Sequence, residues 1–214
     1  MFSYPEVAYE QEPFPHCVVS GAWRGLGSVE AAKWTGQKID AATTHNKKWC
    51  SVIADMPLWC QSLIAEANSP RFLAWLEKTT GERDLLPDPH LEGGGIHRIA
   101  RGGFLKMHTD FNFHRKLRLY RRLNLLLYLT PDWQYEWGGE LLMQDGKDFR
   151  NRIGVVTERN TMVIFTTDDR SWHGHPEPLN CPDGVYRDSI ALYYYSAHRP
   201  FNFAGERYST NYAA

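Results

Sequence analysis

From Gly95 onward the chain is a succession of short β-prone runs separated by turn signals, and this pattern constrains the fold more than any other feature. The runs are rich in β-branched and aromatic residues, as is typical of strands. They cover residues 96–101, 104–108, 122–130, 140–144, 161–166 and 186–196. Pairs such as Gly102-Gly103 and Pro131-Asp132 mark turns between them. Six or more short strands predict a sandwich or barrel of antiparallel sheets, and we expect a jelly-roll core.

The first 90 residues have a different character. Apolar residues recur at helical spacing over residues 56–80. Within this stretch Ser69 is suited to cap a helix that begins at Pro70, and Gly81 is suited to end it. The N-terminal part is therefore predicted to be partly helical.

A single domain, residues 1–214, is the expected organisation. No repeat, low-complexity tract or Gly/Ser linker divides the 214 residues into differently composed parts. We expect residues 1–90 to provide partly helical support and residues 91–200 to form the mainly β jelly-roll core that holds the functional site.

Composition excludes several classes of protein. The formal net charge of −1 creates no overall field toward nucleic acid, so nucleic acid is not expected as a partner. No apolar run reaches membrane-spanning length and the N-terminus does not resemble a signal peptide, so we expect a cytoplasmic protein without a membrane partner. The four cysteines are scattered without a CxxC pair and are expected to be reduced thiols.

The chemistry is indicated by His108-Thr109-Asp110. On an extended segment residues two apart share a face, so His108 and Asp110 can bind one ion together. An imidazole and a carboxylate are two corners of the facial triad of non-haem Fe(II) oxygenases, which a second histidine completes. His173 in the segment SWHGHP is our first choice and His175 the reserve, with His175 interpreted as a wall of the pocket.

A basic residue, Arg187, opens the run 186–196 beyond this second histidine. A guanidinium can bind a carboxylate with two parallel hydrogen bonds. The alternative is an ordinary ion pair with Asp188 or Asp183.

Residues 102–196 resemble the prolyl 4-hydroxylase-like branch of the 2-oxoglutarate/Fe(II) dioxygenases. The matching motifs are GGFLKMHTD, RRLNLLLYLTPDW followed by WGGELLM, TMVIFTT with SWHGHP, and YRDSIALYYYS, in the order typical of the family. The resemblance implies a double-stranded β-helix in which His108, Asp110 and His173 bind Fe(II) and Arg187 holds the distal carboxylate of 2-oxoglutarate. It implies an enzyme that consumes O2 and 2-oxoglutarate, releases succinate and CO2 and hydroxylates a C–H bond, with ascorbate as a candidate reductant.

Further pocket residues follow from strand parity. Ser189 lies two residues from Arg187 and should face the interior with it. On the run 122–130, Asn124 and Tyr128 share a face, where the family usually presents polar groups to 2-oxoglutarate; parity leaves open which of the two contacts it. We predict cofactor contacts from Arg187, Tyr128, Asn124, His175 and Ser189.

The substrate is less constrained. The basic segment after Asp110 contains Arg115, Arg118 and Arg122, which would receive an anionic substrate if they face the site, or would form a solvated hairpin if they do not. A prolyl or other peptidyl residue and a small, anionic metabolite both remain candidates. The competing functions are a non-catalytic jelly-roll binding protein and a Zn(II) hydrolase that uses the same ligands. The sequence does not predict the oligomeric state.

Overall fold

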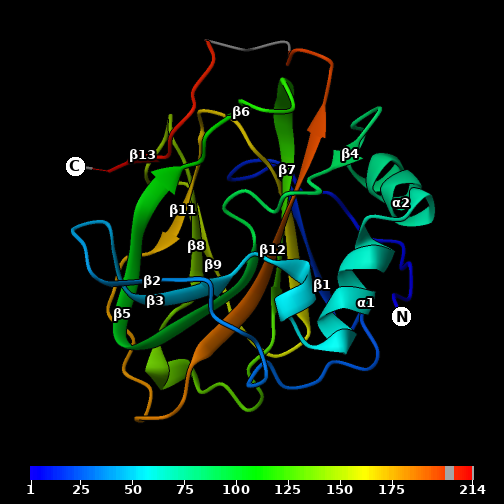
Figure 1. Ribbon diagram of the computed structural model, residues 1–214. Coiled ribbons are helices and arrows are strands. Elements are labelled where there is room, and N and C mark those ends of the chain that lie inside the picture. The colour runs from blue at the N-terminus through cyan, green and yellow to red at the C-terminus, as the bar shows by residue number, and fades with distance from the viewer. Residues whose placement is uncertain (201–204, 214) are drawn as a thin grey trace.

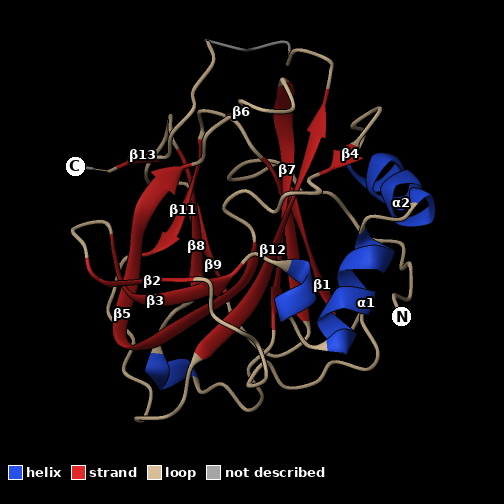
Figure 2. Cartoon of the chain, in the orientation of Figure 1, coloured by secondary structure: helices blue, strands red, loops and turns tan. Residues whose placement is uncertain are grey.

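The structure is a computed structural model that describes residues 1–200 and 205–213, and only the backbone of Asp40 (Figure 1). It is built mainly of antiparallel strands, with two α-helices gathered on one side (Figure 2). The strands are β1 His16–Ser20, β2 Gly36–Asp40, β3 Thr44–Cys50, β4 Leu86–Pro87, β5 Gly95–Thr109, β6 Phe113–His114, β7 Leu119–Tyr128, β8 Leu141–Asp145, β9 Arg152–Val155, β10 Thr161–Thr166, β11 Ser171–His175, β12 Arg187–Ser196 and β13 Asn211–Tyr212. The helices are α1 Leu58–Ala67 and α2 Pro70–Thr80, with 3-10 turns at Ile53–Asp55 and Tyr135–Trp137.

The strands follow the order β1-β10-β7-β12-β5-β11-β8-β9, and every described pairing is antiparallel. The hairpin β2-β3 adds to β5, as does β13, while β4 pairs with β12 and β6 with β7. Most neighbours in this order are distant in sequence, as in a jelly roll. The predicted mainly β jelly-roll core is confirmed.

Strand β5 joins the two halves of this arrangement. Its first part pairs with β12 and β3, and its last part pairs with β11 and β13. The sequence predicts two strands here, broken at Gly102-Gly103; the break is wrong, because the strand continues through the glycines with a shift in its register against β3. Gly102 has a φ of 74°, and a side chain on Gly103 would lie 2.3 Å from Ile99, so only glycine fits this irregularity.

The predicted helical region forms, with a break that separates α1 from α2. The hydroxyl of Ser69 accepts a hydrogen bond from the backbone N–H of Phe72, and Gly81 ends α2 with a φ of 76°. Both helices bury apolar faces against the sheet, with Ile64, Phe72 and Leu76 in the main core. The expectation of a partly helical N-terminal part is correct but incomplete, because β1, β2 and β3 precede the helices and belong to the sheet.

All four cysteines are buried free thiols, as the sequence predicts. None of the helices in residues 1–200 and 205–213 is long and apolar enough to cross a membrane.

Candidate functional site

A cavity of about 220 Å³ lies within the jelly roll, between strands β5, β7, β11 and β12. Every residue that the sequence nominates for metal or co-substrate lines it: His108, Asp110, His173, Arg187, Tyr128, Asn124, His175 and Ser189. The side chains of Asn124 and Tyr128 on β7 therefore face the interior. The alternation of side chains along the strand did not determine which face is inside.

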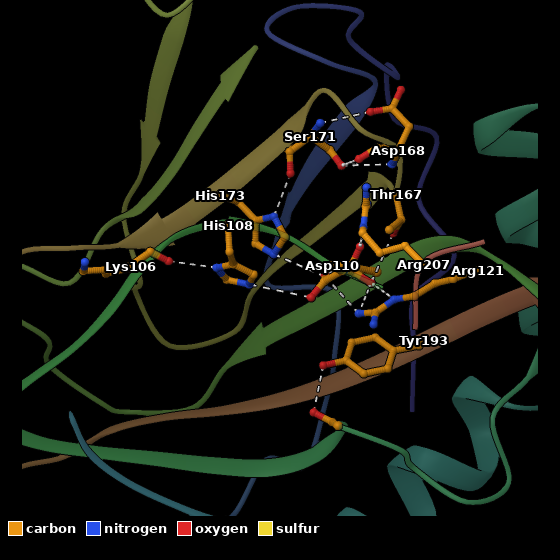
Figure 3. A network of polar contacts seen from close by, with 12 residues as sticks. Lys106, His108, Asp110, Arg121, Thr167, Asp168, Ser171, His173, Tyr193 and Arg207 are labelled. Carbon is orange, nitrogen blue, oxygen red and sulfur yellow. Dashed lines mark hydrogen bonds and ion pairs between the residues drawn. The ribbon is translucent and has the colours of Figure 1, made fainter. Parts of the chain in front are cut away.

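The two histidines and the aspartate of the predicted triad come together at one end of the cavity (Figure 3). His108 near the end of β5 is directly opposite His173 on β11, and Asp110 follows β5. The Nε2 atoms of His108 and His173 lie 3.6 Å and 3.4 Å from the Asp110 carboxylate, and one ligand atom of each residue falls within 4.8 Å of the others. Among the described residues this is the one such cluster of three.

Backbone carbonyls fix the orientation of both imidazoles. Nδ1 of His108 lies 2.9 Å from the carbonyl oxygen of Lys106, and Nδ1 of His173 lies 2.9 Å from that of Ser171. Because a carbonyl only accepts, each Nδ1 donates its hydrogen, and each Nε2 has a free lone pair directed at the same point. Burial and the neighbouring His173 lower the pKa of His108 to about 3, so this imidazole is neutral near pH 7.

The carboxylate of Asp110 is buried and held by two donors. Its Oδ2 accepts hydrogen bonds from Nη2 of Arg121 at 3.0 Å and from the amide of Asn124 at 2.6 Å, which leaves Oδ1 free. Burial alone would raise the pKa of Asp110, but the guanidinium of Arg121 holds it well below its usual range. Two lone pairs and one carboxylate oxygen thus converge on a common point, as a facial triad requires.

Arg121 is a site residue that sequence reasoning missed. It is 1% exposed, donates to both Asp110 and Asn124, and stacks 3.4 Å above the ring of Tyr193. The register of β7 against β12 skips Arg122, and this bulge reverses the alternation of side chains. Arg121 therefore points inward, while Arg122 points outward and pairs with Glu82.

The structure does not bring the predicted substrate-binding arginines to the cavity. Arg122 is held by Glu82, Arg115 stacks on Tyr208 and Arg118 on Phe113. None of the three arginines lines the cavity, and the inward cation of this segment is Arg121; their contact with an anionic substrate stays a prediction.

Arg187 lies at the other end of the cavity, at the start of β12 and 6% exposed. Its Nε donates to the carbonyl of Gly139 at 2.7 Å, and Nη2 lies 3.4 Å from the hydroxyl of Tyr128. A side chain at position 139 would fall 3.0 Å from Cδ of Arg187, so glycine makes room for it. Asp188, the alternative partner considered from the sequence, pairs with Arg98 instead. No carboxylate in the described part of the chain pairs with Arg187.

The remaining predicted contacts divide between the two ends of the cavity. Tyr128 lies beside Arg187, whereas Asn124 uses its amide on Asp110. Ser189 lies next to Tyr128 in the pairing of β12 with β7. His175 is 3% exposed, and within residues 1–200 and 205–213 neither of its ring nitrogens has a hydrogen-bond partner. Burial, Arg187 and Lys47 lower the pKa of His175, so it offers a neutral N–H to a ligand.

The C-terminal segment also contacts the site, although no sequence motif indicated this. Strand β13 pairs with the end of β5, and the ring of Tyr212 lies 5.4 Å from that of His108. Arg207 donates to the backbone carbonyl of Asp110 (Figure 3). It also pairs with Asp169. Further lining residues that the sequence did not indicate include Lys47, His97, Leu105, Phe111 and Thr210.

Known proteins share this fold. The family model of the 2OG-Fe(II) oxygenase superfamily matches residues 94–195. A prolyl-4-hydroxylase from Pseudomonas putida is 17% identical over 74% of this chain and 75% of its own, with a TM-score of 0.53. HygX from Streptomyces hygroscopicus, solved with nickel and 2-oxoglutarate, is 14% identical over 92% of both chains, with a TM-score of 0.58. A prolyl hydroxylase from Trichoplax adhaerens, solved with a hypoxia inducible factor peptide, is 15% identical over 85% of this chain and 83% of its own, with a TM-score of 0.51. No curated protein matches.

A jelly roll with a converging His-Asp-His cluster defines the class of non-haem iron oxygenases. The segment of residues 94–195 is recognised as a 2OG-Fe(II) oxygenase domain. The protein is a 2-oxoglutarate-dependent dioxygenase, and its cofactor and co-substrates are Fe(II), 2-oxoglutarate and O2.

Proposed function

We propose that the protein hydroxylates an unactivated C–H bond, with Fe(II) held by His108, Asp110 and His173 and with 2-oxoglutarate held by Arg187 and Tyr128. The observation that carries the proposal is the prepared donor set: two Nε2 lone pairs and one free carboxylate oxygen within 4.8 Å of one another. A metal needs neutral imidazole and ionised carboxylate ligands; burial favours the neutral form of His108, and Arg121 favours the ionised form of Asp110.

The overall reaction is balanced without any further reductant. One oxygen atom of O2 enters the R–H bond to give R–OH, and the other enters 2-oxoglutarate, which loses CO2 and becomes succinate. The bound iron would supply the oxidising chemistry. The protein's own residues orient the co-substrate and keep water out.

The end of the cavity at Arg187 fits the distal carboxylate of 2-oxoglutarate. A buried guanidinium without a carboxylate partner is costly, and a carboxylate ligand would remove that cost. The hydroxyl of Tyr128 can donate to the same carboxylate, and His175 supplies a further unpaired N–H. Ile99, Leu126 and Leu141 contribute apolar walls to the cavity.

The test combines binding with turnover. Wild-type protein should bind Ni(II) or Fe(II) and then 2-oxoglutarate in calorimetry under anaerobic conditions, and pools of substrates should stimulate succinate release with uptake of O2. A protein that binds Zn(II), hydrolyses a substrate and never consumes 2-oxoglutarate would instead be a hydrolase. A protein that binds neither metal nor 2-oxoglutarate would be a non-catalytic jelly roll.

The substrate is a peptidyl residue or a small metabolite. The Trichoplax neighbour was solved with a peptide fragment, and HygX was also solved with hygromycin B. These two neighbours carry ligands of different kinds, so the choice depends on the residues of this chain that surround the cavity.

A further inference from the structure

A row of cations crosses the sheet beside the cavity. Lys38 on β2 is directly opposite Lys47 on β3, Lys47 is opposite Ile99 on β5, and Ile99 is opposite Arg187 on β12. Residues directly opposite in a sheet share a face, so all four side chains leave the sheet on the side of the cavity. Lys47 and Arg187 are two strand spacings apart, about 9–10 Å between Cα atoms.

The pair of Lys38 and Lys47 is unfavourable as it stands. Like charges directly opposite on adjacent strands destabilise a sheet. Within residues 1–200 and 205–213, Lys47 makes no hydrogen bond or ion pair, although it is partly buried. Its own burial and the charge on Lys38 lower the pKa of Lys47 to about 8. An anion between these two amines would relieve both penalties.

A recess of about 200 Å³ adjoins the cavity at this point. The recess and the cavity share Lys47, His97, Leu105, Gly93 and Tyr212, so one continues into the other. Lys38 and Trp49 line only the recess, and Arg187 and the three triad residues line only the cavity. No described Asp or Glu lines the recess, so nothing there would attract a cationic group.

We propose that Lys38 and Lys47 form an anion subsite for the substrate, which is a small molecule with a carboxylate or phosphate group. The anion is bound in the recess, and the apolar body of the substrate passes Leu105 and Tyr212 toward His108, Asp110 and His173. The proposal rests on the proposed function, because it names the substrate class of that same site. It also moves the anion contact from the arginines after Asp110 to the β2-β3 hairpin.

The position of Lys47 favours the substrate over 2-oxoglutarate as its ligand. Arg187 and Tyr128 already offer donors for the distal carboxylate of the co-substrate, at the end of the cavity that the recess does not reach. Lys47 instead lies where the recess joins the cavity, and its Lys38 partner is exposed at the outside. A ligand that enters from the recess meets the two lysines first.

The experiment uses Ni(II)-loaded protein saturated with 2-oxoglutarate, so that Arg187 is occupied. Calorimetry measures the binding of butanoate and inorganic phosphate, with butanamide as the neutral counterpart of butanoate. The variants are Lys47→Met, Lys38→Met and the double variant. Lys48→Met is the matched control, since Lys48 is exposed, carries the same charge and lies on the opposite face of β3.

We expect an anion to bind at least about tenfold more weakly to Lys47→Met and to the double variant, because a charge-assisted hydrogen bond is lost. Lys48→Met should stay within about twofold of wild type, Lys47→Arg should retain binding, and butanamide should not bind measurably. Equal binding of butanoate to wild type and the double variant would overturn the subsite. A tenfold loss of 2-oxoglutarate affinity in Lys47→Met, with butanoate unaffected, would assign Lys47 to the co-substrate and also overturn it. A screen that finds a peptide substrate whose turnover ignores Lys38 and Lys47 would do the same.

These outcomes are separate from failure of the proposed function. If wild-type protein binds no 2-oxoglutarate after metal loading, the oxygenase assignment fails whatever the lysines bind. If it binds 2-oxoglutarate and the lysine variants bind anions normally, only the subsite fails. Thermal melting of each variant verifies that it is folded.

Discussion

The two ends of the cavity are built on opposite electrostatic principles. At the metal end the Asp110 carboxylate is compensated by Arg121 and Asn124, and both imidazoles have a backbone partner. At the other end Arg187 and Lys47 have no carboxylate partner among the described residues. The first end is organised before any ligand arrives, and the second is completed by ligands.

This difference assigns a separate consequence to each end. Removing a group from the metal end should damage metal binding and the stability of the protein itself. Removing a cation from the other end should weaken the binding of an anion and leave the metal in place. Uncompensated buried charge is costly in the absence of ligand, so loss of Arg187 or Lys47 should not lower stability as loss of Arg121 does.

The largest effect is expected from Asp110→Ala. Loss of the one carboxylate ligand should weaken Ni(II) or Fe(II) binding by at least about a hundredfold and abolish succinate formation linked to substrate. Calorimetry with metal and a succinate assay measure the two effects, and His108→Ala should behave in the same way. Asp148→Ala, which removes an exposed carboxylate, is the control. Undiminished succinate formation by the Asp110 variant would contradict the assignment of the triad.

Arg187→Met should act on the co-substrate alone. Loss of a buried, bidentate carboxylate partner should weaken 2-oxoglutarate binding by about tenfold to a hundredfold, while the affinity for Ni(II) stays within about threefold. The same calorimeter measures both, with metal first and 2-oxoglutarate second. Arg150→Met, at an exposed position, should change neither. Parallel losses of metal and 2-oxoglutarate would show that the two ends are not independent.

Arg121→Met tests whether the metal end is organised in advance. Removing one partner of a buried ion pair typically costs about 3 kcal/mol or more, so the free energy of unfolding of metal-free protein should fall by that order. Added Ni(II) should restore part of the loss, because a bound cation again compensates Asp110. Chemical denaturation with and without Ni(II) gives both values. Arg122→Met, which breaks the less buried pair with Glu82, should cost about 1 kcal/mol or less; a larger cost there than at Arg121 would refute the distinction.

The sequence predicted the fold where local signals agree with the structure. The apolar run of β10 matches its predicted bounds, and the cap signals at Ser69 and Gly81 are confirmed in α2. Strands β2, β3 and β11 carried no such signal, because polar residues such as Lys47 and His173 occupy their interior positions. Positions that violate the hydrophobic pattern of a strand are those where function places polar groups, so a pattern-based prediction fails there first.

The sequence predicted those parts of the candidate site in which the spacing of residues along the chain determines their positions in space. His108 and Asp110 are two residues apart on an extended segment, and a family motif indicated His173 and Arg187, all of which line one cavity. Arg121 was not predicted because the bulge at Arg122 reverses the alternation of side chains along β7. A prediction from the alternation in the sequence assumes a strand without bulges. Lys47 and Tyr212 reach the cavity only through long-range strand pairing, which periodicity does not encode.

The smallest expected effect is a pH dependence of anion binding at Lys47, in the part of the cavity whose charges are compensated only by ligands. Because the pKa of Lys47 is lowered to about 8, its ammonium is fully present below about pH 7 and is lost as the pH rises through 8. Butanoate remains ionised over this range, so its affinity for the nickel and 2-oxoglutarate complex should be constant below pH 7 and fall by up to about tenfold between pH 7 and 9. Lys47→Arg keeps its charge throughout and should abolish the fall. If the affinity of Lys47→Arg for butanoate falls equally with rising pH, the titrating group is not Lys47. The contrast between the two ends would then lose this support.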